Sequence, residues 1–128
     1  MTSPDAEGGE RAPAALLVDD DDEVARVFTR ALERAGFVVH RARTGTDALG
    51  LLAHAERLDA AIVDLVLPGA GGLDVVRGIR EKSSRCRIVA VTGLGDAAVE
   101  RAFRDAGADA FLAKPVDLAR LLAAVRPG

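Results

Sequence analysis

Five short apolar segments are spaced along the chain, and a longer amphipathic segment follows each of them. The apolar segments are rich in Val, Ile, Leu and Ala, are too short for helices, and lack polar alternation. That pattern is typical of strands buried on both faces of a sheet. The predicted strands are Ala14–Val18, Phe37–Val39, Ala60–Val63, Ile88–Val91 and Ala110–Ala113.

The segments between these strands carry apolar residues at helical spacing. Gly36 and Gly107 supply stop signals after the first and fourth helices, while Thr44 and Asp117 are predicted N-caps of the second and fifth. The predicted apolar stripes are Val24, Val27, Phe28, Ala31, Leu32 and Ala35; Ala48, Leu51, Leu52 and Ala55; Leu73, Val76 and Ile79; Val99, Ala102, Phe103 and Ala106; and Leu118, Leu121, Leu122 and Val125.

Strands that alternate with helices predict an α/β fold of the (βα)5 type, with right-handed crossovers and helices on both faces of a parallel sheet. Five strands suit the doubly wound order 2-1-3-4-5 of flavodoxin-like proteins. With 128 residues the chain has room for one domain, which we expect over residues 14–126. Residues 1–13 are acidic and rich in Gly and Pro, and we expect a disordered leader there.

Composition narrows the class of protein. No apolar run approaches the ~20 residues that cross a bilayer, so a membrane protein is not expected. The net charge of −3, from 17 basic and 20 acidic residues, gives no electrostatic reason to expect direct nucleic-acid binding. The single cysteine, Cys86, excludes an internal disulfide, fits a reducing compartment such as the cytoplasm, and is expected to be buried.

Polar residues follow four of the five predicted strands directly. Asp19 and Asp20 follow the first strand, Asp64 the third, Thr92 the fourth and Lys114 the fifth. In the order 2-1-3-4-5 ligands bind beyond the carboxyl ends of the strands, where the first and third strands are neighbours. Taken singly, each residue has an ordinary explanation, such as a helix cap, an Asx turn or a loop lysine. Their joint occurrence at the ends of separate strands favours one common site.

The chemistry of such a site would be phosphoryl transfer. Three carboxylates in a partly dry cleft repel one another and need a divalent cation or protons. Oxygen-only ligands favour Mg²⁺ or Mn²⁺, and no Cys/His set for zinc is present. A metal, a carboxylate nucleophile, a hydroxyl and a lysine suit a reaction dominated by charge neutralisation and positioning. Asp21, Asp22 and Glu23 are assigned instead to the start of the first helix, and His40 and His54 to the surface, with His40 at the end of an edge strand.

Four segments carry a resemblance to a known family. They are Leu16-Leu-Val-Asp-Asp20, Ile62-Val-Asp-Leu-Val-Leu-Pro-Gly-Ala-Gly-Gly72, Val89-Ala-Val-Thr-Gly93 and Phe111-Leu-Ala-Lys-Pro115. In this order and strand context they resemble the receiver domains of response regulators in two-component signalling, the CheY-like domains. The resemblance covers all of the chain except the leader.

The resemblance implies a role for each matching residue. Asp64 would be the phosphoacceptor, taking a phosphoryl group from a phosphohistidine of a histidine kinase or a histidine phosphotransfer protein. Asp20 and Asp64 would bind Mg²⁺, as would the backbone carbonyl of Val66, while Asp19 would act chiefly through a bound water. Such a domain catalyses only its own phosphorylation and dephosphorylation, so it is not expected to be an enzyme acting on a separate substrate.

The remaining matches imply a conformational switch. Lys114 would pair with the phosphoryl oxygens, and the peptide bond to Pro115 would be cis. Thr92 would hydrogen-bond the phosphoryl group, and Phe111 would rotate into the vacated space and change the protein-binding face formed by the fourth helix, fifth strand and fifth helix. An ordinary core aromatic is the alternative interpretation of Phe111.

Two departures from the family pattern affect expectations. Gly71 stands where relatives often have an acidic or amide residue, in a turn with Gly69, Ala70 and Gly72, so we expect a looser loop but an intact site. Val66 and Leu94 stand two residues after Asp64 and Thr92 and are apolar. Our hypothesis is that they shield the acyl phosphate and slow its hydrolysis.

Several alternatives stay open at this stage. The chain ends shortly after the fifth predicted helix, so it is either a stand-alone regulator, favoured modestly by the Met1 leader, or a receiver from a hybrid histidine kinase or a larger transcription regulator. A haloacid-dehalogenase-type phosphatase would need an acid at Val66, and a pseudo-receiver would lack one of the acids, the lysine or the acceptor. The downstream target is unknown, and we expect a monomer, with dimerisation on phosphorylation left open.

Overall fold

Five parallel strands form one sheet in the order β2-β1-β3-β4-β5, as the alternating pattern predicts. The structure is a computed structural model, and it describes residues 12–55, 57–66, 71–93 and 97–126. The strands are β1 (Ala14–Val18), β2 (Val38–Ala42), β3 (Ala60–Asp64), β4 (Arg87–Thr92) and β5 (Ala110–Ala113). The helices are α1 (Asp22–Arg34), α2 (Gly45–His54), α3 (Gly72–Lys82), α4 (Ala97–Ala106) and α5 (Leu118–Val125).

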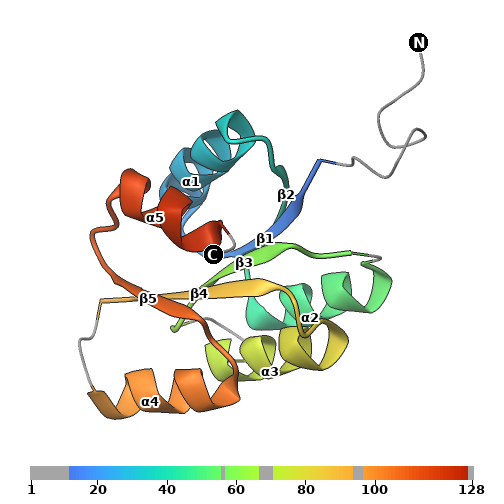
Figure 1. Ribbon diagram of the computed structural model, residues 1–128, viewed down its shortest axis with the longest axis vertical. Helices are drawn as coiled ribbons and strands as arrows, with labels where there is room; N and C mark the ends of the chain where they lie inside the picture. Colours follow the sequence, from blue (N-terminus) through green and yellow to red (C-terminus); the bar gives the residue numbers. More distant parts are fainter. Residues whose placement is uncertain (1–11, 56, 67–70, 94–96, 127–128) are drawn as a thin grey trace.

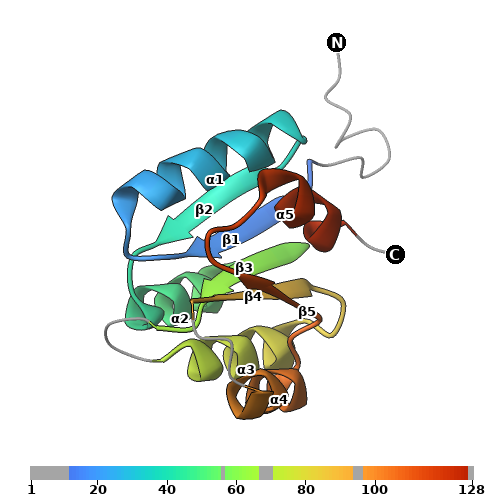
Figure 2. The same ribbon diagram turned by 90° about the vertical axis from the view of Figure 1, so that its left-hand side faces the viewer.

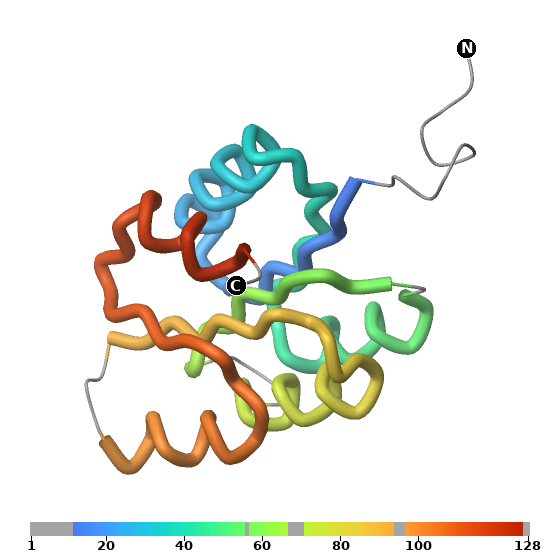
Figure 3. Tube along the Cα trace, viewed as in Figure 1, coloured from blue at the N-terminus to red at the C-terminus, as the bar shows by residue number. Residues whose placement is uncertain are grey.

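The helices cover both faces of the sheet. Helices α1 and α5 lie on one face, and α2, α3 and α4 lie on the other (Figures 1 and 2). Along the Cα trace, the first helix, α1, covers one face of the sheet. The next three helices, α2, α3 and α4, cover the other face, and α5 lies beside α1 on the first face (Figure 3). None of the helices that the structure describes has the length and apolar character needed to cross a bilayer.

Side chains of the inner strands alternate between two hydrophobic cores. On β1, Leu16 and Val18 pack under α2 and α3, whereas Ala15 and Leu17 pack under α1 and α5. The strands β3 and β4 alternate in the same way, with Val63 in the first core and Ile62 in the second. Because both faces are covered, these strands are apolar at every position except the terminal Asp64 of β3 and Arg87 and Thr92 of β4, which is why they are recognisable as apolar runs.

The predicted position of β2 was wrong. The strand runs from Val38 to Ala42 rather than over Phe37–Val39, so His40 lies in the middle of it and not at its end. As an edge strand β2 has alternating exposed and half-buried residues, and polar side chains at His40 and Arg41 are compatible with that position. A criterion that required an unbroken apolar run therefore ended the strand too early.

Most helix boundaries agree with the predicted signals. The side chains of Thr44 and Asp117 accept the expected capping hydrogen bonds, and Gly36 and Gly107 have positive φ angles of 102° and 122° after the first and fourth helices. The predicted apolar stripes were too wide, because a helix lying on a sheet buries only the residues that face it. Val27, Leu51, Ala102 and Leu118 lie at the margins of the stripes and are exposed.

Some expectations fall outside the described residues. These concern most of the leader, the Pro68–Ala70 part of the glycine-rich turn, and Leu94.

The start of α3 lies against the end of β3, and Gly72 allows that approach. A Cβ atom at position 72 would lie 2.8 Å from the backbone oxygen of Asp64 and 3.2 Å from the Cα of Leu65. Backbone atoms cannot move aside as a flexible side chain can. A larger residue at this position would therefore separate α3 from the strand end that carries Asp64.

We expect Gly72→Ala to destabilise the protein by about 1–3 kcal/mol, the usual cost of forcing extra atoms into a packed position. Urea unfolding measures this loss. Gly71→Ala is the matched control, since a Cβ at position 71 meets nothing within 4 Å, and its cost should stay below about 1 kcal/mol. Equal losses from the two substitutions would contradict the assignment of a steric role to Gly72.

Candidate functional site

Four consecutive aspartates follow β1, and the fold gives each of them a different environment. Asp19 is buried, with 2% of its surface exposed, and its Oδ1 accepts a hydrogen bond from the Asp21 backbone N–H at 2.8 Å. Asp20 is exposed. Asp21 is the N-cap of α1 and accepts hydrogen bonds from the backbone N–H groups of Glu23 and Val24. Asp22 lies in the first turn of α1 and forms ion pairs with two arginines.

Asp64 is the last residue of β3, and both of its carboxylate oxygens have partners. Its Oδ1 accepts a hydrogen bond from the Val66 backbone N–H at 3.0 Å, and its Oδ2 lies 2.8 Å from Lys114 Nζ. Only 4% of the residue is exposed. The carboxylate is thus held in a fixed orientation at the edge of the sheet.

The carboxylates of Asp19, Asp20 and Asp64 converge as the strand order predicts. One oxygen from each lies within 4.8 Å of the other two. Among the described residues this is the one group of three or more His, Cys, Asp or Glu side chains that could hold a metal ion. The donors are all oxygens, which suits Mg²⁺ or Mn²⁺ rather than zinc.

The charge of this cluster is poorly compensated inside the protein. Burial raises the pKa of Asp19, and the neighbouring charges of Asp64 and Asp20 raise it further, against the opposing effects of the Asp21 N–H and Lys114. Burial by itself would lower the pKa of Lys114, but the hydrogen bond and charge of Asp64, together with Asp19 and Asp20, raise it overall. One ammonium ion therefore faces three carboxylates, which favours the entry of a further cation.

Lys114 directly follows β5, and its backbone N–H donates to the Thr92 carbonyl at 2.8 Å. This bond continues the pairing of β4 with β5 and brings the residue that ends β4 beside the lysine. The Lys114–Pro115 peptide bond is cis, as predicted. The strand ends thus place a hydroxyl-bearing residue and an ammonium on the β4–β5 side of Asp64.

Phe111 lies on β5 and is partly buried against α4. Its ring makes an edge contact with Phe103, with centroids 6.3 Å apart, and the Arg104 guanidinium lies 5.0 Å from its centroid. The ring therefore packs in the core that it shares with Phe103, and it is also bordered by solvent. This position is compatible with both interpretations of Phe111, the switch residue and the core aromatic.

Sequence reasoning missed two arginines beside the acidic loop. Arg41, on β2, donates from Nε and Nη2 to the Asp19 carbonyl oxygen at 3.1 and 2.8 Å, and its Nη1 lies 2.9 Å from Asp22. Arg43 lies 2.7 Å from the same Asp22 carboxylate. The Arg41 hydrogen bond and the charges of both arginines lower the pKa of Asp22. No spacing in the sequence distinguishes these two arginines from the chain's other basic residues.

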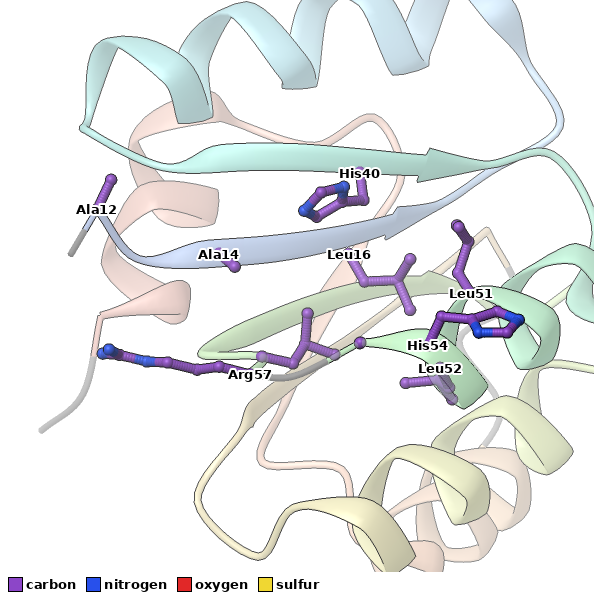
Figure 4. A pocket seen from close by; sticks show the side chains of 10 residues that line it. Ala12, Ala14, Leu16, His40, Leu51, Leu52, His54 and Arg57 are labelled. Carbon is purple, nitrogen blue, oxygen red and sulfur yellow. The ribbon is translucent and has the colours of Figure 1, made fainter. Parts of the chain in front are cut away.

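The two histidines lie elsewhere, as predicted for surface residues. They line a largely apolar cavity of about 350 Å³ between β1, β2 and α2, with His40 reaching it from the edge strand and His54 from the end of α2 (Figure 4). The acidic cluster does not border this cavity. Cys86 is buried as expected, and burial raises the pKa of its thiol to about 12.

Comparisons with known proteins agree with this geometry. A family model described as the response regulator receiver domain matches residues 15–126. A cyclic di-GMP phosphodiesterase of Thermotoga maritima is 38% identical over 103 residues, which cover 80% of this chain and 27% of that protein. The photosynthetic apparatus regulatory protein RegA of Cereibacter sphaeroides is 40% identical over 102 residues, which cover 80% of this chain and 55% of that protein. The chain thus spans about a quarter and about half of these two relatives.

A solved structure gives the same result for the fold. The crystal structure of a response regulator protein from Burkholderia pseudomallei, with a phosphorylated aspartic acid, a calcium ion and citrate, matches with a TM-score of 0.82 at 32% identity. The match covers 89% of this chain and 66% of that one. Since the family model matches most of the chain and the strand order is that of the family, this chain belongs to the response-regulator receiver domains.

Proposed function

We propose that Asp64 accepts a phosphoryl group from the phosphohistidine of a histidine kinase or a histidine phosphotransfer protein. The observation that carries the proposal is the environment of this carboxylate, which is nearly buried at the end of β3, hydrogen-bonded to Val66 and Lys114, and adjacent to two more acids. A related response regulator contains a phosphorylated aspartic acid, which supports the same chemistry here.

The transfer exchanges one bond to phosphorus for another. A carboxylate oxygen of Asp64 forms a bond to phosphorus while the bond between phosphorus and the donor imidazole nitrogen breaks, and the nitrogen keeps the electron pair. Lys114 Nζ, already 2.8 Å from Asp64, would neutralise charge on the phosphoryl oxygens. Asp64 is fixed by its partners, so little orientational freedom is lost at the moment of transfer.

The acidic cluster fits a bound Mg²⁺ or Mn²⁺. Its three carboxylates lie close enough to share one ion, and two of them are almost completely buried, which makes an uncompensated negative charge unfavourable. Asp20 and Asp64 would hold the ion directly, Asp19 would act chiefly through a water, and the Val66 carbonyl would supply a further oxygen. When bound, the ion neutralises charge on the carboxylates and on the transferring phosphoryl group.

The new charge would then act on the β4–β5 side of the site. Thr92 would hydrogen-bond the phosphoryl group, and Phe111 would rotate and alter the surface formed by α4, β5 and α5. A downstream protein would read that surface. The position of Phe111 between the core and solvent is compatible with such a movement.

The receiver-domain family consists of signalling domains. We propose that this chain passes its signal to a downstream protein by direct contact. We assign the phosphoacceptor domain to residues 14–126 and the protein to the cytoplasm. Relatives of which the chain covers only a part have different names and activities, so a receiver within a larger regulator or hybrid kinase remains the second candidate for the whole protein.

Phosphorylation is tested with acetyl phosphate and Mg²⁺. We expect intact-protein mass spectrometry to show the addition of one phosphoryl group to the wild-type chain and none to Asp64→Asn. Asp74→Asn is the matched control, since this carboxylate lies exposed on α3 and should leave the modification unchanged. An unmodified wild-type chain, or a phosphoryl group mapped to another residue, would contradict the proposal.

The rate of dephosphorylation tests the roles of Val66 and Leu94. Val66 is 66% exposed beside the acceptor, and Leu94 lies outside the described residues. Apolar side chains neither orient a water nor accept its proton, so we expect Val66→Asn combined with Leu94→Glu to shorten the phosphoryl half-life severalfold. Phosphate release after removal of acetyl phosphate measures this. An unchanged half-life, or the same shortening in Val66→Ile combined with Leu94→Met, would contradict the shielding role.

Asp19→Asn tests the charge imbalance of the metal-free site. The pKa of Asp19 in the folded protein is raised above its unfolded value of 3.8. The ionised carboxylate therefore lowers the free energy of unfolding. This loss grows as the pH rises from 3.8 through the folded pKa and is complete above it. We therefore expect Asp19→Asn to have the higher free energy of unfolding at pH 7 in EDTA, with a difference that shrinks toward pH 4. Urea unfolding with Asp74→Asn as control measures this, and a less stable Asp19→Asn at pH 7 would contradict it.

A further inference from the structure

We propose that Arg41 is a positioning residue for the acidic loop, and that it holds Asp19 and Asp20 in the arrangement that a divalent cation requires. The proposal rests on the proposed function, because it concerns the same cation site. Its basis is a set of contacts between the end of β2 and the loop that joins β1 to α1.

The Arg41 guanidinium makes two contacts, one with the loop after β1 and one with the first residue of α1. Its Nε and Nη2 donate to the carbonyl oxygen of Asp19 at 3.1 and 2.8 Å, and its Nη1 lies 2.9 Å from Oδ1 of Asp22. Asp20 lies between these two anchors in the chain. The planar guanidinium, with its fixed set of donors, therefore holds the chain on both sides of the exposed acid, through the backbone of Asp19 and the side chain of Asp22.

A backbone hydrogen bond completes the attachment. The N–H of Asp19 donates to the carbonyl of Ala42 at 3.1 Å, so both backbone polar groups of Asp19 are bound to neighbouring residues of β2. The Asp19 side chain is held separately by the Asp21 N–H. The peptide that joins Asp19 to Asp20 is thus fixed through its carbonyl, and the direction of the Asp20 side chain depends on that peptide.

The charge of Arg41 and its hydrogen bonds have opposite effects on the affinity of the site for a divalent cation. A guanidinium close to the acidic cluster repels a divalent cation, so its charge alone weakens metal binding. Its hydrogen bonds order the ligands before the ion arrives, which strengthens binding. Removal of Arg41 therefore tightens cation binding if only its charge matters and weakens it if positioning dominates.

Arg43 provides a matched control on the same stretch of chain. It carries the same charge and forms a 2.7 Å ion pair with Asp22, and in the described part of the chain its hydrogen bond and ion pair both go to that carboxylate. Its side chain is 59% exposed, compared with 25% for Arg41. Arg43→Gln thus removes a nearby charge and leaves the bonds to Asp19 in place.

The experiment is an NMR titration of the full chain with Mg²⁺ alone. The variants are Arg41→Gln, Arg41→Lys and Arg43→Gln, with Asp20→Asn as the baseline for a disabled site. We expect Arg41→Gln to weaken Mg²⁺ binding by about tenfold or more, as for other residues that orient metal ligands. Arg41→Lys should also weaken it, because an ammonium keeps the charge but lacks the planar fork, and Arg43→Gln should bind Mg²⁺ as tightly as wild type or more tightly.

The metal-free spectra supply a second readout. The Asp21 amide donates to Asp19, so its chemical shift should move in Arg41→Gln and stay in place in Arg43→Gln. Urea unfolding confirms that each variant is folded. Mg²⁺ binding by Arg41→Gln at wild-type strength or tighter would overturn the inference. A wild-type chain that binds Mg²⁺ no better than Asp20→Asn would overturn the proposed cation site instead, and the Asp21 amide shift would still decide whether Arg41 orders the loop.

Discussion

The rest of the site depends on the crowding of three carboxylates at one edge of the sheet. Parallel strands all end at the same edge, so the residues after β1 and β3 are brought together whenever these strands are neighbours. Asp19 and Asp64 cannot move away from each other, because their strands are joined by the hydrogen bonds of the sheet. The fold therefore maintains a concentration of negative charge that the two side chains would avoid in an open chain.

The surrounding structure neutralises part of this charge and fixes the orientation of the carboxylates. Lys114 faces the cluster from β5, and the N–H groups of Val66 and Asp21 each bind one carboxylate. These partners fix the carboxylates without neutralising all of them. An incompletely compensated but well-ordered set of oxygens is suited to a divalent cation, which would in turn neutralise the charge of an incoming phosphoryl group.

The strands on the two sides of β3 contribute differently to this arrangement. On the side of β2, Arg41 and the N–H of Asp19 attach the acidic loop to the edge strand. On the side of β4 and β5, Lys114 and Thr92 are joined through the backbone, and Phe111 packs with Phe103 of α4. Fixed ligands thus lie on one side of Asp64, and the residues proposed to respond to phosphorylation lie on the other.

The sequence by itself determined the strand order, the layer arrangement and the residues at the strand ends. Strands buried on both faces must be apolar throughout, and Asp19, Asp64 and Lys114 stand out because they interrupt or end such runs. Only the tertiary structure decided the burial of Asp19 beside an exposed Asp20, the ion pairs of Asp22, the extent of the edge strand β2, and the contacts of Arg41 with Asp19. The contacts of Arg41 with Asp19 and Asp22 join residues that are far apart in the sequence and meet only across the sheet. Exposed or half-buried polar side chains form no periodic pattern, so such contacts cannot be predicted from the sequence.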